Sequence, residues 1–324
     1  MTRRLTARSE GWPLARPFRI SRGEKSVADV VVATLSDDGR KGQGECVPYA
    51  RYGETPESVL AQIGGVDASL TRRELLAALP AGAARNAVDC AMWDLEAKER
   101  GRSVAALLDR DEPGAVPTAV TVVIDTPERM AAAAAIASAP LIKVKVNAEN
   151  PIEMVRAVRS AAPRARLIVD PNESWTPALL RQVLPELAKL EIALIEQPIP
   201  AAEDAALAGL APAPPICADE SAHTRADISR IAQCYQAVNI KLDKAGGLTE
   251  ALAMASAARV AGLKIMVGCM VCTSLAIQPA LLLAQSADFV DLDGPWWLKE
   301  DRTDAVRIDN GVLTPPLSGW GKPD

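Results

Sequence analysis

The chain has 324 residues, 49% of them apolar, and its 36 basic and 41 acidic residues give a net charge of −5. This length predicts about two domains, and the scattered basic residues argue against a nucleic-acid surface or an anionic membrane as a partner. The charged start lacks the apolar core of a signal peptide, and no apolar run reaches the roughly 18 residues of a membrane span. Six cysteines spread through the chain do not form the pattern of a disulfide framework, so we expect a cytoplasmic protein.

Residues 1–112 combine strand-like and helix-like segments, which predicts a first domain of the α+β type. The run Val30–Leu35 is rich in β-branched and other apolar residues and predicts a strand. The segment Ala83–Arg100 carries apolar residues at helical spacing and stops at Gly101, so it predicts a long helix.

A repeating pattern begins near residue 117 and predicts a parallel barrel. Apolar, strand-like runs recur every 22 to 27 residues and start near residues 117, 141, 165, 192, 215, 237, 264 and 288. Most of the intervals carry an alanine- or leucine-rich helical pattern, as in Pro127–Ala139, Pro177–Leu190 and Thr249–Ala261. Eight strands that alternate with helices indicate a (β/α) barrel over residues 113–299.

The barrel segment is shorter than the roughly 200 residues that a complete eightfold barrel needs. No amphipathic helix follows the eighth strand, which starts at Phe289. We therefore expect the last helix to be missing, which gives a (β/α)7β barrel. The tail, residues 300–324, contains a hairpin-like piece around Val306–Leu313 and is expected to return to the first domain.

Three acidic residues follow three successive apolar runs: Asp170, Glu196 and Asp219. A charge at the end of a buried strand is costly unless it is paired or bound to an ion. Carboxylates from three neighbouring strands form an oxygen cage of the kind that Mg²⁺ prefers. The pattern predicts a site for a divalent cation at this end of the barrel.

Lysines occur at the same level of the barrel on both sides of the predicted acid cage. Lys143 and Lys145 precede the cage and share one face of their strand, and Lys241 follows it. Any single one of these residues alone would be read as a surface charge at a strand end. Five strands in a row that end in charged residues point instead to the catalytic end of a barrel enzyme.

These motifs are similar to those of the enolase superfamily, in its muconate-lactonizing-enzyme-like subgroup, which carries Lys-x-Lys, three metal acids and a further lysine on successive barrel strands. Within it, the chain most resembles the dipeptide epimerases that act on L-Ala-D/L-Glu. Pro171 departs from the alanine common at that position. The resemblance covers the whole chain and is carried by the segments Gly44–Glu54, Leu79–Asp89, Ile168–Trp175, Ile216–Arg225, Val238–Glu250 and Asp291–Trp296.

The residue types fit an abstraction of the proton beside a carboxylate. The resulting enolate is unstable in water, and a divalent cation on the substrate carboxylate stabilises its charge. Lys145 and Lys241 should lie across the barrel mouth from each other, and we expect Lys143 and the metal to lower the pKa of the base toward the roughly 7–8 that suits it. The resemblance implies one Mg²⁺ per subunit, with Mn²⁺ as a possible substitute. It also implies that Lys145 acts on the L-glutamyl centre and Lys241 on the D centre.

Substrate specificity has one clear candidate in Asp291 and Asp293, two residues apart at the end of the eighth strand. A dipeptide ammonium group needs a carboxylate partner, and the resemblance implies this role for the Asp-x-Asp pair. The alternative is that both are turn acids before Gly294. Asn172 shares a strand face with Asp170, and Arg22 or Arg51 is expected to bind the far carboxylate of a glutamyl residue.

Two further signals are given a structural interpretation. Cys269 and Cys272 have the spacing of a zinc or redox pair, but no second pair is present and His223 is the only histidine. Packing of the seventh strand explains them better. The single histidine also argues against the related subgroup that uses a histidine base.

The sequence thus predicts a Mg²⁺-dependent epimerase that interconverts L-Ala-D-Glu and L-Ala-L-Glu, tolerates other second residues and serves murein peptide metabolism. Two alternatives stay open. One is a cycloisomerase or o-succinylbenzoate synthase on the same scaffold, whose substrates carry no ammonium group. The other is a barrel that binds without catalysis. A homo-oligomer is compatible with the sequence but is not indicated by it.

Overall fold

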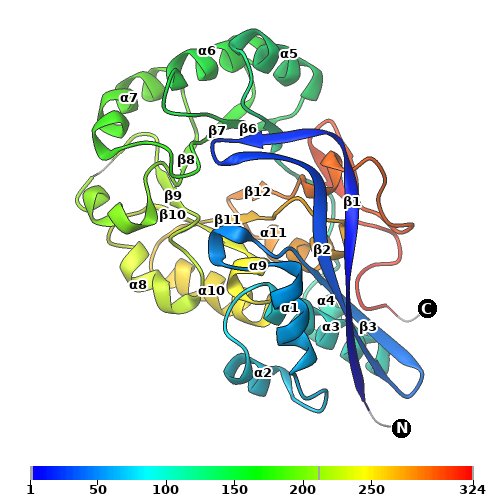
Figure 1. Cartoon of the computed structure of the whole chain (residues 1–324). Coiled ribbons are helices and arrows are strands. Elements are labelled where there is room, and N and C mark those ends of the chain that lie inside the picture. Colours follow the sequence, from blue (N-terminus) through cyan, green and yellow to red (C-terminus); the bar gives the residue numbers. More distant parts are fainter. Residues whose placement is uncertain (1–2, 211, 323–324) are drawn as a thin grey trace.

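A computed structural model describes residues 3–210 and 212–322. The first part of the chain forms a three-stranded antiparallel sheet in the order β1-β2-β3, with strands β1 (Arg4–Ile20), β2 (Gly23–Asp37) and β3 (Arg40–Cys46). It also contains a short 3-10 helix, η1 (Ala50–Tyr52), and the helices α1 (Pro56–Gly64), α2 (Arg72–Ala78), α3 (Ala83–Arg100) and α4 (Val104–Leu107). The α+β character of this part and the helix Ala83–Arg100 are as predicted. Figure 1 shows the long β1–β2 hairpin reaching across the barrel.

Helix α3 packs directly on strand β3 through two glycines. A side-chain carbon at Gly44 would overlap the carbonyl oxygen of Ala87, and one at Gly42 would overlap that of Ala91. The spacing of these glycines along the strand places both on the face that meets the helix. Their function is close helix–sheet packing.

Replacing Gly44 by alanine should therefore destabilise the protein. We expect the free energy of unfolding to fall by about 3 kcal/mol, because the added methyl group meets backbone atoms that cannot move aside. Gly64→Ala is the control: no atom lies within 4 Å of the added methyl group, so stability should stay within about 1 kcal/mol. Urea unfolding of both variants measures the difference, and equal midpoints would contradict this role of Gly44.

The second part of the chain forms a parallel eight-stranded sheet in sequential order from β5 to β12. Backbone hydrogen bonding between Ala119 and Val290 links its two ends, with a donor–acceptor distance of 2.8 Å. The predicted (β/α)7β barrel is confirmed. Its strands are β5 (Val120–Val122), β6 (Leu141–Lys145), β7 (Arg166–Asp170), β8 (Leu194–Glu196), β9 (Ile216–Ala218), β10 (Ala237–Lys241), β11 (Lys264–Gly268) and β12 (Phe289–Asp291).

Helices connect the strands and cover the outside of the barrel. In α5 and α7, a threonine side chain caps the first turn and proline fills the first helical position, so both helices begin at the predicted residues. The connections contain α5 (Pro127–Ala137), α6 (Pro151–Ala161), α7 (Pro177–Lys189), η2 (Ala201–Leu207), η3 (Arg225–Asp227), α8 (Ile228–Ile231), α9 (Leu242–Ala245), α10 (Leu248–Val260) and α11 (Ser274–Ala284). No described helix is both long and apolar enough to cross a membrane.

The two ends of the barrel segment differ in detail from the prediction. The strand expected near residue 117 is interrupted: β4 (Val116–Pro117) pairs with β14 (Val312–Thr314), and the barrel strand starts only at Val120. Pro117 has no backbone N–H to give to a barrel neighbour. After β12 the described chain continues through η4 (Gly294–Trp297) into the hairpin of β13 (Arg307–Asp309) and β14, without an eighth helix. The backbone N–H of Val104 in α4 donates to the carbonyl of Trp320.

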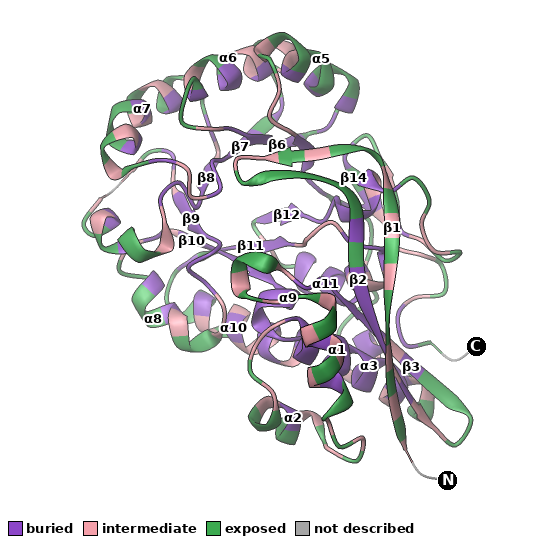
Figure 2. Ribbon diagram, viewed as in Figure 1, coloured by how far each residue is buried: buried purple, intermediate pink, exposed green. Residues whose placement is uncertain are grey.

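Residues inside the barrel form two layers. Figure 2 shows the strands of the barrel largely buried and the outer faces of its helices exposed. Side chains alternate along each strand. An inward-facing residue is therefore followed, two positions later and closer to the carboxyl end of the strand, by another inward-facing residue in the next layer. The lower layer is an apolar cluster formed by Ala119, Leu141, Ile168, Leu194, Cys217, Ala237, Met266 and Phe289. The polar layer above it contains Thr121, Lys143, Asp170, Glu196, Asp219, Asn239, Gly268 and Asp291.

Candidate active site

A cavity of about 320 Å³ lies between the carboxyl ends of the barrel strands and two segments of the first part of the chain. The segments are the turn between β1 and β2 and the loop around η1. Ser21 and Arg22 of that turn donate hydrogen bonds to the backbone carbonyls of Pro171 and Asn172, in the loop after β7. The cavity lining includes the predicted residues Lys143, Lys145, Asn172, Asp219, Lys241, Asp291, Asp293, Arg22 and Arg51.

Lys143 occupies the centre of the acid cluster. Its Nζ lies 3.0 Å from Asp170 Oδ2, 2.7 Å from Glu196 Oε2 and 2.8 Å from Asp291 Oδ2. Lys145 Nζ lies 2.5 Å from Asp170 Oδ2. All of these side chains are buried, so the charges interact with little screening by water.

The third predicted metal acid, Asp219, is held by two lysines. Lys241 Nζ lies 2.7 Å from Asp219 Oδ2, and Lys244 Nζ lies 2.5 Å from Asp219 Oδ1. Strands β6 and β10, which carry Lys145 and Lys241, are separated by three strands in either direction around the barrel. The two lysines therefore approach the cavity from opposite sides.

The acids are close together but do not form a ready-made cation cage. Within residues 3–210 and 212–322, no three carboxylate, thiolate or imidazole groups are arranged as metal ligands. Ammonium groups stand next to the acids instead. Glu196 Oε1 accepts a hydrogen bond from Asn239 (2.8 Å), whereas its buried Oε2 accepts none, despite its distance of 2.7 Å from Lys143.

The donor set nevertheless fits a hard divalent cation. Asp170, Glu196 and Asp219 are almost completely buried and provide oxygen ligands from three adjacent strands. Burial, with the neighbouring Asp170, raises the pKa of Glu196 to about 7. Among the described residues, Glu196 Oε2 accepts no hydrogen bond and is next to Lys143 alone, so it is free to serve as a ligand of a cation bound by these three acids.

The carboxylates raise the pKa values of Lys143 and Lys241 in the absence of a bound cation. Burial disfavours their charged forms, but Asp170, Asp291 and Glu196 raise the pKa of Lys143 well above its usual range. Asp219 likewise raises the pKa of Lys241. In both cases carboxylates within 3.0 Å of the ammonium group have the larger effect. A cation bound to Asp219 would compete with Lys241 for that carboxylate.

Asp291 and Asp293 follow the prediction in position but differ in their contacts. Asp291 Oδ2 is paired with Lys143, while its buried Oδ1 accepts no hydrogen bond. Asp293 Oδ2 accepts hydrogen bonds from the backbone N–H of Thr121 (2.7 Å) and the indole of Trp297 (3.3 Å). Burial and the charge of Asp291 raise the pKa of Asp293 to about 6. The pair thus has room for one more cationic donor.

The loop after β7 connects the barrel to the first part of the chain. Its residues Asn172 and Glu173 have positive φ angles of 48° and 66°, a backbone conformation that is rare outside glycine. Asn172 Oδ1 accepts a hydrogen bond from Lys145 Nζ at 3.1 Å. The backbone carbonyl of Asn172 accepts one from Arg22 at 3.1 Å.

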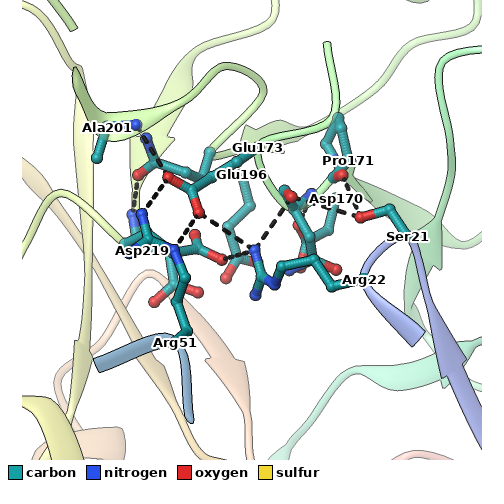
Figure 3. Close-up of polar contacts among 12 residues, drawn as sticks. Ser21, Arg22, Arg51, Asp170, Pro171, Glu173, Glu196, Ala201 and Asp219 are labelled. Atoms are coloured by element: carbon teal, nitrogen blue, oxygen red, sulfur yellow. Dashed lines mark hydrogen bonds and ion pairs between the residues drawn. The ribbon is translucent and has the colours of Figure 1, made fainter. Parts of the chain in front are cut away.

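Figure 3 shows Arg22 and Arg51 on either side of Glu173. Arg51 donates two hydrogen bonds to the Glu173 carboxylate, at 2.8 and 2.9 Å, and Arg22 approaches it at 3.3 Å. Arg22 also pairs with the buried Glu220 at 2.7 Å. Both arginines predicted for substrate binding are therefore close to the cavity, but Arg51 is already bound in bidentate fashion.

Four residues that hold this site together were given no role from the sequence: Glu173, Glu220, Asn239 and Lys244. Glu220 directly follows the predicted metal ligand Asp219, and Lys244 stands three residues after Lys241. Their positions in the sequence therefore indicated that they lie near the site. Asn239 shares its strand face with Lys241 and was equally readable from alternation. Glu173 lies in the segment Ile168–Trp175, but no local pattern predicts its partners, because Arg22 and Arg51 come from distant parts of the chain.

The discounted residues have structural contacts. Cys269 lines the cavity, Cys272 is buried, and the six cysteines are unpaired. The His223 ring makes an edge contact with Tyr52 at 4.9 Å between centroids. Burial lowers the pKa of His223, which leaves it neutral at physiological pH and fits a packing role.

The fold and these contacts agree with comparisons to known proteins. Residues 2–109 match the family described as mandelate racemase / muconate lactonizing enzyme, N-terminal domain, and residues 127–322 match the one described as enolase C-terminal domain-like. The chain belongs to the enolase superfamily. The resemblance found in the sequence, to the muconate-lactonizing-enzyme-like subgroup and its dipeptide epimerases, is thereby confirmed.

Two curated members of the superfamily are similar over almost the whole chain. The L-Ala-D/L-Glu epimerase of Escherichia coli K12 is 51% identical over 311 residues, which are 94% of this chain and 97% of that protein. The N-acetyl-D-glutamate racemase of a Pseudoalteromonas species is 45% identical over 300 residues, 90% of this chain and 95% of that protein. This enolase superfamily member is accordingly an isomerase of the epimerase class.

Solved structures agree with this assignment. An enolase family member from Agrobacterium tumefaciens with homology to dipeptide epimerases contains bound sodium and L-Ala-L-Glu. It is 46% identical with a TM-score of 0.95, and the match covers 98% of this chain and 100% of that one. The dipeptide epimerase of Cytophaga hutchinsonii, in complex with Mg and D-Ala-L-Val, is 26% identical with a TM-score of 0.91, and the match covers 99% and 95%.

Proposed function

We propose that this enzyme epimerises the second residue of L-Ala-D-Glu and L-Ala-L-Glu, and that it depends on Mg²⁺. The observation that carries the proposal is the placement of Lys145 and Lys241 on opposite strands of the barrel, both buried and both lining one cavity. Inversion of a carbon centre by two bases requires one base on each face of the substrate. The dipeptides named for the relatives support the substrate class.

Asp170, Glu196 and Asp219 would hold the divalent cation. When bound, the cation supplies Lewis-acid stabilisation for negative charge that develops on the substrate carboxylate. Lys145 removes the α-proton from one face, and Lys241 returns a proton to the other. To accept the α-proton, Lys145 must be in its neutral amine form, and Asn172 fixes the position of its Nζ by accepting a hydrogen bond from it.

Recognition of the two ends of the dipeptide falls to different residues. The unpaired Oδ1 of Asp291 accepts a hydrogen bond from the N-terminal ammonium group, with Asp293 beside it. At the other end, Arg22 is the better candidate for the glutamyl side-chain carboxylate. Among the described residues, its Nη2 has one hydrogen-bond partner, the Tyr49 hydroxyl at 3.4 Å, whereas Nε and Nη2 of Arg51 both donate to the Glu173 carboxylate at 2.8 and 2.9 Å.

A role in the reuse of murein peptides in the cytoplasm follows from the proposed substrate, because L-Ala-D-Glu occurs in those peptides. The unpaired cysteines fit a reducing compartment. A cycloisomerase or o-succinylbenzoate synthase is less well supported. Their substrates bring no ammonium group, which would leave Asp291 Oδ1 buried without a partner, at a cost in binding.

Proton NMR of L-Ala-L-Glu in D₂O tests the proposal directly. With Mg²⁺, we expect loss of the glutamyl α-proton signal together with a new methyl doublet from L-Ala-D-Glu. Removal of Mg²⁺ by EDTA should stop both changes. Absence of exchange with Mg²⁺ present would refute the glutamyl dipeptide as substrate.

Replacing Asp291 by asparagine should separate dipeptides from N-acylated amino acids. We expect kcat/KM for L-Ala-L-Glu to fall about 10- to 100-fold, because a hydrogen bond between charged groups is lost. N-acetyl-L-glutamate, which has no ammonium group, should be turned over at a nearly unchanged rate, however low. NMR exchange assays of both compounds measure this. Asp125→Asn serves as control, since the contacts of Asp125 within the described residues are with Thr126 and Arg129, beside it on its own loop and helix. Equal losses on both compounds would mean that Asp291 acts through Lys143 alone.

A further inference from the structure

Glu220 is a buried carboxylate that the proposed reaction does not use. It directly follows Asp219, is 4% exposed and lines the cavity. Its Oε1 lies 2.7 Å from Arg22 Nη1, while its Oε2 is buried and accepts no hydrogen bond. A buried carboxylate with a single cationic partner becomes costly as soon as that partner is removed. The pairing with Arg22 is therefore the main compensation for this charge on the cavity wall.

Arg22 reaches Glu220 from another part of the chain. It lies in the turn between β1 and β2, and its side chain is 28% exposed, whereas that of Glu220 is 1% exposed. Figure 3 shows its guanidinium directed toward the barrel loops, where it also contacts Glu173. The two acids are not equivalent, because Glu173 has Arg51 and the backbone N–H of Ala201 as further donors. Without Arg22, Glu173 would stay paired and Glu220 would not.

We propose that Glu220 is a specificity-determining residue whose preference for a cationic second residue is masked by Arg22. This inference rests on the proposed function. With Arg22 in place, the wall of the cavity offers a guanidinium group to a glutamyl carboxylate. With Arg22 removed, the same wall offers the carboxylate of Glu220, and a lysyl ammonium group can take the place of the guanidinium. Selectivity for the acidic substrate thus combines attraction by Arg22 with repulsion by Glu220, which would disfavour a carboxylate if Arg22 were absent.

The test compares three dipeptides, L-Ala-L-Glu, L-Ala-L-Lys and the neutral L-Ala-L-Gln, by α-proton exchange in D₂O with Mg²⁺. In Arg22→Met, we expect kcat/KM for L-Ala-L-Glu to fall about 100-fold relative to L-Ala-L-Gln. The ratio of L-Ala-L-Lys to L-Ala-L-Gln should rise about tenfold over that of the wild type. Because each value is a ratio within one variant, a general loss of activity or folding does not move it.

A second substitution assigns the gain to Glu220. In Arg22→Met/Glu220→Gln, the preference for L-Ala-L-Lys should return to the wild-type ratio, whereas in Arg22→Met/Glu173→Gln it should persist. Arg259→Met is the control, because Arg259 pairs with Asp288 just before β12, at the end of the barrel away from the cavity, and its ratios should equal those of the wild type. Arg22→Gln provides a second version of the first change if the methionine variant is poorly soluble.

Two results would overturn the inference. Equal changes on all three dipeptides in both Arg22 variants would mean that Arg22 serves only to hold the hairpin on the barrel. A gain on L-Ala-L-Lys that survives the Glu220→Gln change would place the acid elsewhere. Failure of the proposed function looks different: the wild-type enzyme would then exchange none of the three dipeptides.

Discussion

Replacing Lys145 by alanine should abolish epimerisation and remove proton exchange from one diastereomer only. Exchange of the α-proton of L-Ala-L-Glu should fall about 10²- to 10⁴-fold, the usual contribution of a positioned general base. Exchange of L-Ala-D-Glu should persist, because Lys241 on the opposite strand is untouched. Lys241→Ala should give the mirror image. Proton NMR of each diastereomer in D₂O measures both effects in one experiment.

Loss of exchange on one diastereomer only would show that each lysine acts as a base and does not merely balance the charge of the acid cluster. Both lysines also pair with proposed metal ligands, Lys145 with Asp170 and Lys241 with Asp219, so either alanine variant alters the acid cluster. If that were their only role, each variant would lose exchange on both diastereomers alike. Lys264→Ala is the control, since this exposed lysine begins β11 at the other end of the barrel. Full exchange of L-Ala-L-Glu by Lys145→Ala would point to a different base.

Replacing Glu196 by glutamine should weaken Mg²⁺ binding and slow the reaction strongly. The amide oxygen can keep the hydrogen bond from Asn239, so the barrel geometry is preserved while one negative charge is lost. We expect kcat/KM to fall roughly 10²- to 10³-fold, which corresponds to several kcal/mol of charge stabilisation by the metal. Isothermal titration with Mg²⁺ reports the loss of affinity independently of turnover. Unchanged affinity would exclude Glu196 as a ligand.

The same residue makes the effect of Mg²⁺ on stability depend on pH. In metal-free protein, burial and the charge of Asp170 raise the pKa of Glu196 to about 7, from about 4.5 for an unperturbed glutamate. The folded state then binds the proton more tightly than the unfolded state. The contribution of the protonated Glu196 side chain to the free energy of unfolding is fully present below about pH 4.5 and is lost as the pH rises through about 7.

Mg²⁺ should therefore stabilise the wild-type enzyme more at pH 8 than at pH 5.5, because only the ionised carboxylate needs a cation. At about 100 times its dissociation constant, the ion should add about 2.7 kcal/mol to the free energy of unfolding. Thermal unfolding with Mg²⁺ or EDTA at both pH values measures this, and Glu196→Gln should show a smaller difference between them. A Mg²⁺ effect that is equal at both pH values would contradict the assignment.

Strand periodicity explains why so much of the barrel could be predicted. A buried parallel strand needs an apolar run and its covering helix needs an amphipathic one, so the repeat of 22 to 27 residues is visible without any long-range information. Strand β1 was not predicted. Its 17 residues are exposed or half-buried, so its sequence lacks the apolar pattern of a core strand. It is a strand because its backbone pairs with β2. Pro117 interrupted the first predicted barrel strand for the local reason that it cannot donate a hydrogen bond.

The sequence alone determined the polar layer of the site. Once the strands are placed, alternation assigns Lys143, Asp170, Glu196, Asp219 and Asp291 to the barrel interior, because each stands two residues beyond an apolar residue that faces inward. Only the tertiary structure decided which partners complete the site. Arg22 meets Glu173 across 151 positions and two parts of the fold, and no local pattern encodes that contact. It depends on where the β1–β2 hairpin lies over the barrel, which is set by packing of the whole chain.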